Sequence, residues 1–103
     1  MVRVNLKTDG YFDPRKQGHA YVAIIRRDES GKVRRDFINN VNRVWDRKRK
    51  RYIAEWEFDV QVGTVIEARL SASWRNDYRC YYAVEEDGLK AISKEEALLR
   101  RSA

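Results

Sequence analysis

The sequence predicts a mainly β fold, a small antiparallel barrel-like or two-layer meander of about seven short strands with a short C-terminal helix. Two long stretches alternate apolar and polar residues with a period of two, which is typical of strands that bury one face. Turn signals separate several shorter strand-like runs, and only the last residues have a helical pattern. We favour the barrel, because strands of this number leave few of the 103 residues for a second complete sheet.

The longest alternating stretch covers residues 52–62. Its expected buried side is Tyr52, Ala54, Trp56, Phe58, Val60 and Val62, and its expected exposed side includes Ile53, Glu55, Glu57 and Asp59. A second stretch follows Gly63, with Ile66, Ala68, Leu70, Ala72 and Trp74 expected inside and Glu67, Arg69, Ser71 and Ser73 outside. Because glycine accepts a positive φ, residues 62–64 are predicted to join the two strands as an antiparallel hairpin.

Shorter runs predict the remaining strands, at residues 2–7, 19–26, 33–38, 41–46, 79–85 and 89–92. The run from His19 to Arg26 is apolar on both faces, which indicates a central strand. Cys80 alternates with Tyr82 and Val84 and is therefore expected in the core.

The C-terminal helix is predicted to begin after Ser93. Its hydroxyl is placed to cap the backbone amide of Glu96, and the Glu96 carboxylate is placed to reach back to the amide of Ser93. Arg100 and Arg101 are expected in the last turn, where positive charge suits the helix dipole.

Composition limits the class of protein. No linker or repeat divides the chain, so residues 1–103 are expected to form a single basic domain. No apolar run approaches the ~20 residues that a helix needs to cross a bilayer, and the N-terminus lacks the apolar core of a secretory signal. We therefore expect a cytoplasmic protein that has no membrane partner. One cysteine, Cys80, and one histidine, His19, exclude a disulfide or a multi-ligand metal site built from these residues. We expect no cofactor and no metal.

Charge is distributed unevenly along the chain. Residues 1–51 contain 15 Lys and Arg against 6 Asp and Glu, whereas residues 52–103 contain 7 against 10. The first half therefore carries a net charge of +9 and the second half −3. A one-sided positive field attracts polyanions, of which nucleic acids are the commonest in cells.

A basic run lies between the strands predicted at 41–46 and 52–62. It consists of Arg47, Lys48, Arg49, Lys50 and Arg51. Adjacent positive charges repel one another, so we expect this hairpin tip in solvent or against phosphates. Trp45 and Tyr52 flank it, and Arg43 precedes it; Trp45 is a candidate stacking platform, whereas the phase of Tyr52 favours the core. A solvated loop, a nuclear-localisation signal and an anionic-membrane patch remain alternatives for the run.

More cations surround the predicted turn at residues 28–32. Arg26, Arg27, Lys32, Arg34 and Arg35 are expected to extend the basic surface as a stripe if this hairpin and the basic hairpin share a sheet. Arg34 and Arg35 point to opposite faces, so at most one joins it, and we include Arg34 among the binding residues.

The first 38 residues resemble the opening of the ribonuclease H fold. The resemblance rests on a strand that ends in Thr8-Asp9-Gly10, a glycine-containing loop and an apolar strand entered through His19-Ala20. It would imply that Asp9 and further carboxylates hold two magnesium ions that activate water. Asp9 is the only residue that carries over, because no helical period follows Ile38 and the nearest acidic candidate, Glu55, lies on an alternating strand. We find no acid–base pair or activated nucleophile and expect no catalytic residues.

The sequence therefore predicts a small nucleic-acid-binding protein that is not an enzyme. RNA is favoured over DNA, within a ribosome or another ribonucleoprotein assembly, because a compact β domain with a projecting basic hairpin suits folded RNA. A barrel that binds single-stranded DNA is an alternative, with Tyr11, Phe12, Tyr78 and Tyr81 as candidate exposed aromatics. A protein-interaction module is another, with Glu55, Glu57, Asp59 and Glu67 forming an acidic face.

Overall fold

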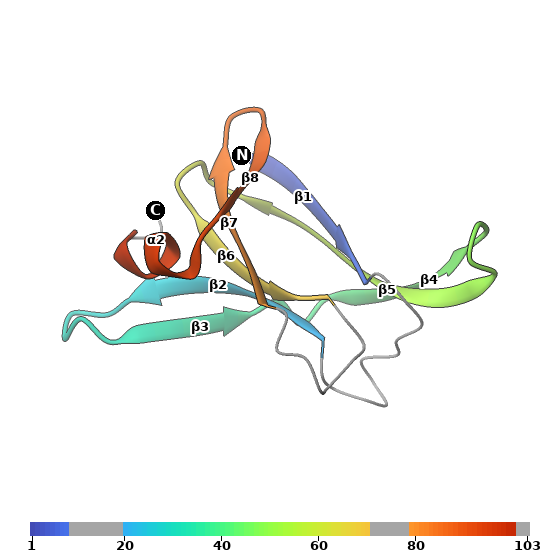
Figure 1. Ribbon diagram of the computed structural model, residues 1–103, viewed down its shortest axis with the longest axis horizontal. Coiled ribbons are helices and arrows are strands. Elements are labelled where there is room, and N and C mark those ends of the chain that lie inside the picture. The colour runs from blue at the N-terminus through green and yellow to red at the C-terminus, as the bar shows by residue number, and fades with distance from the viewer. Residues whose placement is uncertain (9–19, 71–78, 101–103) are drawn as a thin grey trace.

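The computed structural model describes residues 1–8, 20–70 and 79–100. Eight strands and one helix lie in these ranges (Figure 1). They are β1 (Val2–Lys7), β2 (Tyr21–Arg27), β3 (Val33–Phe37), β4 (Val41–Asp46), β5 (Arg51–Val60), β6 (Val65–Arg69), β7 (Arg79–Glu85), β8 (Gly88–Ile92) and α2 (Lys94–Leu99). The mainly β prediction is confirmed.

The strands form two antiparallel sheets. One has the order β1-β5-β4 and the other the order β3-β2-β6-β7-β8. The two sheets do not close into a barrel, so the two-layer alternative describes this chain and the favoured barrel does not. β2 lies between β3 and β6, as its apolar faces predicted.

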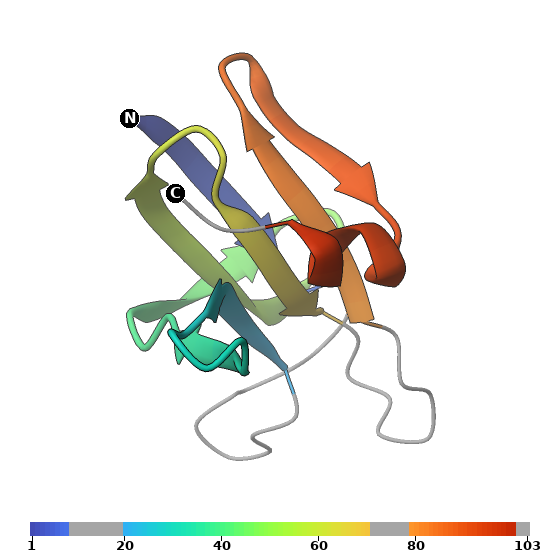
Figure 2. The same cartoon turned by 90° about the vertical axis from the view of Figure 1, so that its left-hand side faces the viewer.

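The main core lies between the two sheets. Trp56 and Val4 come from the three-stranded sheet, and Val22, Ile66 and Val84 from the five-stranded sheet, all at most 2 % exposed. The opposite face of the five-stranded sheet holds a smaller cluster around Ile25, Val65, Tyr81 and Ala97, which the helix helps to cover. Figure 2 shows α2 lying across this face beside β7 and β8.

The predicted hairpin between β5 and β6 is wrong. Gly63 does turn the chain, with a φ of +93°, but β5 pairs with β1 and β4 while β6 pairs with β2 and β7. The turn instead passes the chain from one layer to the other. Because β6 is then central and covered on both faces, Glu67 is buried, not exposed as predicted.

The faces of β5 follow the alternation in its middle and depart from it at its ends. Ala54, Trp56 and Val60 are buried as predicted, whereas Tyr52 is 39 % exposed and Val62 47 % exposed. Ile53, predicted outside, is 4 % exposed. The period of two identifies which residues share a face, but not where the covering layer stops.

The helix begins as predicted, with the Ser93 hydroxyl accepting a hydrogen bond from the Glu96 amide at 3.1 Å. It ends at Leu99, so Arg100 is the C-cap residue and not a member of the last turn, and Arg101 lies outside the described residues. The Glu96 carboxylate accepts a hydrogen bond from Arg100 at 2.5 Å. In the described ranges, no helix is long and apolar enough to span a bilayer.

Replacing Ser93 with alanine should lower the free energy of unfolding by ~0.5–2 kcal/mol, because the Glu96 amide in the first turn of the helix loses its acceptor. Thermal unfolding followed by circular dichroism measures this change. Ser93→Asp keeps an acceptor at the cap and should melt close to the wild type. Equal melting temperatures for Ser93→Ala and the wild type would show that the cap does not stabilise the fold.

Candidate nucleic-acid interface

The basic run caps a hairpin, as predicted. Its strands β4 and β5 pair from Val41 opposite Trp56 to Asp46 opposite Arg51. Asp46 Oδ1 accepts hydrogen bonds from the amides of Lys48 (3.0 Å) and Arg49 (3.3 Å), and Lys50 takes a φ of +53°. Figure 1 shows this β4–β5 arm projecting from the body of the molecule at one end of its long axis.

All five tip cations, Arg47 to Arg51, are exposed. Asp46 in the turn lies 3.8 Å from the Arg49 guanidinium and offsets one of the five charges. Arg49 also donates to the Thr8 carbonyl at 3.5 Å, and Arg51 to the Arg49 carbonyl at 3.4 Å. Arg49 and Arg51 therefore take part in the hairpin itself.

Three side chains next to the tip form a cluster on one face of the arm, which we call the arm cluster: Arg43, Trp45 and Tyr52. The Trp45 and Tyr52 rings meet edge to face, with centroids 5.0 Å apart. The Arg43 guanidinium carbon lies 3.8 Å from the centre of the Tyr52 ring. Trp45 is 53 % exposed. The prediction that Tyr52 belongs to the core is wrong, and both rings are available at the surface.

Arg34 lies at the other end of the molecule. Its strand β3 belongs to the five-stranded sheet, whereas the arm belongs to the three-stranded sheet, and Figure 1 shows the β2–β3 turn and the arm tip at opposite ends of the long axis. Arg34 pairs with Asp28 at 3.0 Å. Hydrogen bonds from Ser30 and Arg34 lower the pKa of Asp28 to about 2. The stripe was expected only if the two hairpins share a sheet, and they do not.

The acidic residues of the long strand are matched by cations of β1. Arg3 lies 3.2 Å from Glu57 and 3.1 Å from Asp59, and Lys7 lies 3.6 Å from Glu55. Opposite charges directly across an antiparallel pair stabilise the sheet modestly. This face is a mixed surface of both signs, not the acidic face that the sequence suggested.

The buried Glu67 carboxylate joins four neighbouring strands. Its Oε1 accepts from Tyr21 of β2 (2.8 Å) and from Arg35 Nε of β3 (2.7 Å). Its Oε2 accepts from Arg35 Nη2 (3.2 Å) and from Tyr81 of β7 (2.9 Å). Both oxygens are thus paired twice, which is what a carboxylate with 0 % exposure requires. Tyr81 is buried by this contact and is not the exposed aromatic that we predicted.

This network fixes the protonation of its members. Burial acts to raise the pKa of Glu67, but hydrogen bonds from Arg35, Tyr21 and Tyr81 outweigh it and hold that pKa below its usual value. Burial and the hydrogen bond to Glu67 raise the pKa of Tyr21 to about 12. At neutral pH the network therefore contains an ionised carboxylate, a guanidinium and two phenol donors.

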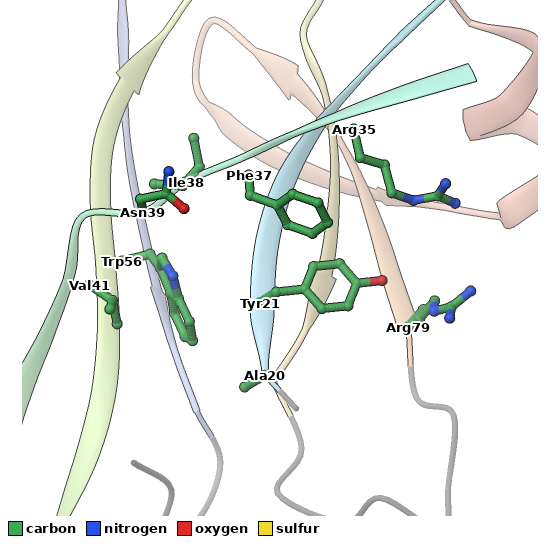
Figure 3. Close-up of a pocket in the computed structure, with 9 residues that line it drawn as sticks. All are labelled: Ala20, Tyr21, Arg35, Phe37, Ile38, Asn39, Val41, Trp56 and Arg79. Atoms are coloured by element: carbon green, nitrogen blue, oxygen red, sulfur yellow. The ribbon is translucent and has the colours of Figure 1, made fainter. Parts of the chain in front are cut away.

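A pocket of about 740 Å³ opens beside this network, where β3 leads into β4 (Figure 3). Tyr21 and Phe37 meet edge to face in it, with ring centroids 5.5 Å apart. Asn39 lies on one side of the two rings, and the guanidinium groups of Arg35 and Arg79 lie on the other. Sequence reasoning missed this pocket, because its lining residues come from five separate strands and from the segments next to β2 and β3.

Other predicted positions contribute no site. Cys80 is exposed, so its expected place in the core is wrong. Asp9, Tyr11, Phe12, His19, Trp74 and Tyr78 lie outside the described residues. Glu55 lies on a strand, and residues 1–8, 20–70 and 79–100 contain no group of acidic, His and Cys side chains placed to hold a metal.

No family model, curated protein or solved structure was found to match the chain.

Replacing Glu67 with glutamine should lower the free energy of unfolding by about 3 kcal/mol, because Arg35 loses its ionic partner in a buried site. Arg35 is 37 % exposed and can regain water, which limits the loss. Because folding lowers the pKa of Glu67, its ionised form stabilises the protein above the unfolded value of about 4.3, and this stabilisation is lost as pH falls. Urea unfolding at several pH values should show that the free energies of unfolding of the wild type and Glu67→Gln converge at acidic pH. A difference between the two free energies that stays constant with pH would contradict this stabilisation by the ionised carboxylate.

Proposed function

We propose that the protein binds RNA that contains unpaired nucleotides, through the β4–β5 arm. The observation that carries the proposal is the exposed arm cluster beside five exposed cations. Exposed apolar side chains that gather in one patch mark interaction sites more often than single ones do, and here two aromatic rings lie on one face with a guanidinium.

Each part of the arm suits a different part of a nucleotide. The tip cations suit phosphates, since each neutralised phosphate releases counterions and so favours binding. Trp45 and Tyr52 suit unpaired bases, because stacking on an aromatic ring is worth ~1–3 kcal/mol per base. A duplex keeps its bases stacked internally, so the arm cluster favours loops, bulges and single strands.

Single-stranded DNA is the second candidate, because phosphates and base faces are common to both nucleic acids. The protein-interaction module loses its support, since Arg3 and Lys7 pair with the acidic residues on which it rested and Glu67 is buried. A place in a cytoplasmic ribonucleoprotein, without chemistry on the RNA, remains part of the proposal.

The triple variant Arg47→Gln, Lys48→Gln, Lys50→Gln should bind more weakly to every sequence, because phosphate contacts do not select bases. Replacing these three residues leaves intact the hydrogen bonds that Arg49 and Arg51 make within the hairpin and to Thr8. The slope of log affinity against log salt should flatten by about two units, at roughly 0.7 per lost contact with a single strand. Fluorescence anisotropy of labelled RNA and DNA oligonucleotides, single-stranded and duplex, measures both quantities.

The matched control is Lys32→Gln, Lys90→Gln, Lys94→Gln, which removes three exposed lysines elsewhere and the same net charge. Its salt slope should stay close to that of the wild type. Equal losses in both triple variants would mean that net charge and not the arm drives binding.

Trp45→Ala should weaken binding to single-stranded RNA by about 5- to 150-fold while leaving the salt slope unchanged, because it removes stacking and no charge. Binding to duplex RNA should change little. Loss of affinity for duplex and single strand alike would contradict a stacking role. The variant also loses the Trp45–Tyr52 contact, which should lower the free energy of unfolding by ~0.5–1.5 kcal/mol and leave the protein folded at the temperature of the binding assay.

A further inference from the structure

The pocket at the β3–β4 junction has the features of a site for a planar, negatively charged ligand. Its volume of about 740 Å³ lies within the range of ~300–1,000 Å³ that holds small ligands. Phe37 lies on the edge strand β3 and is 53 % exposed. An aromatic ring left open in a concave site, next to a second ring, is a platform for a flat apolar group.

The polar groups around the rings are placed for recognition. Figure 3 shows the Tyr21 and Phe37 rings in the middle of the pocket, the Asn39 carboxamide on one side and the Arg35 and Arg79 guanidinium groups on the other. A carboxamide offers both donors and an acceptor, as the edge of a nucleobase requires. Guanidinium groups suit phosphate.

The cationic side of the pocket is held in place before a ligand arrives. Arg35 makes two hydrogen bonds to Glu67, and Tyr21 donates a third to the same carboxylate. The guanidinium groups of Arg35 and Arg79 thus lie beside the rings, and that of Arg35 is fixed by the Glu67 carboxylate. Side chains that are already ordered lose little conformational freedom on binding.

The pocket is continuous with the arm. Val41 and Trp56 line it, and they are paired directly across β4 and β5. On the same face the next pairs are Arg43 opposite Ala54 and Trp45 opposite Tyr52. At about 3.3 Å per strand residue, the pocket wall at Val41 and the ring of Trp45 are about 13 Å apart along β4. One face therefore leads from the pocket to the arm cluster.

We propose that the pocket holds one unpaired nucleotide of the strand that the arm binds, with the base against Tyr21 and Phe37, its edge at Asn39 and its phosphate at Arg35 and Arg79. This inference rests on the proposed function of the arm. The inference assigns base recognition to the pocket and sequence-independent affinity to the tip. The ligand that the pocket recognises is a nucleoside monophosphate, either free or within a strand.

The first test compares the wild type, Phe37→Ala and Asn39→Ala with Val62→Ala, which shortens a similarly exposed apolar side chain outside the pocket. Single-stranded RNAs of the four homopolymer sequences are titrated by anisotropy at several salt concentrations. Phe37→Ala should lose about 5- to 150-fold in affinity with no change in salt slope. Asn39→Ala should narrow the differences among the four sequences. Val62→Ala should match the wild type. Wild-type affinity and selectivity in both pocket variants would overturn the inference.

The second test uses the free wild-type protein and the four nucleoside monophosphates at millimolar concentration, with ribose 5-phosphate as the control without a base. Amide NMR signals of Tyr21, Ile38 and Asn39 should shift more with the nucleotides than with the sugar phosphate, which lacks the base. If no oligonucleotide binds, the function proposed for the arm fails, and these shifts alone decide on the pocket. Their presence supports a base-binding pocket, and their absence overturns it.

Discussion

The buried Glu67 carboxylate is the constraint on which the rest of the five-stranded sheet depends. A charge with 0 % exposure is tolerated only if every lone pair has a partner, and here the partners come from β2, β3 and β7. Four strands must therefore hold one register for the charge to be satisfied. The same requirement places Arg35 and Tyr21 at the mouth of the pocket, so the stability of the sheet and the shape of the pocket have a common origin.

The arm exists because β5 is longer than its partner β1. β1 pairs with residues 55–60 of β5 and β4 pairs with residues 51–56, so residues 51–54 are paired with β4 and not with β1. The face that buries Trp56 continues through the buried Ala54 to Tyr52, which is 39 % exposed. The apolar side of the strand thus emerges into solvent without any change in its pattern. A two-stranded ribbon of this kind is marginal alone, and the Trp45–Tyr52 contact and the Arg43 stack cover part of its open face.

The features that the sequence predicted well are local. Alternation identified the strands, the Ser93 cap was visible in four residues, and the basic tip followed from its flanking strands. The failures involve partners far apart in the chain. Glu67 was expected in solvent because nothing near it in sequence indicates Arg35, 32 residues away. β5 and β6 were expected to pair because adjacent strands usually do, yet burying two alternating faces required them to enter different layers. Tyr52 was expected in the core because it shares a face with Ala54 and Trp56, but the core does not extend as far as Tyr52.

Charge and shape act at different places on this molecule, and that separation bears on how the proposed RNA binding would work. The tip carries five exposed cations with one nearby carboxylate, so its attraction to phosphate would depend strongly on salt and little on sequence. The pocket places two rings and an amide beside the guanidinium groups, so its contribution would depend on the base and less on salt. The acidic residues of β5 alternate with Trp56 and so lie on the opposite face of the strand, where Arg3 and Lys7 pair with them. A nucleic-acid strand drawn in by the tip would therefore reach the arm cluster and the pocket on the face that does not carry these carboxylates.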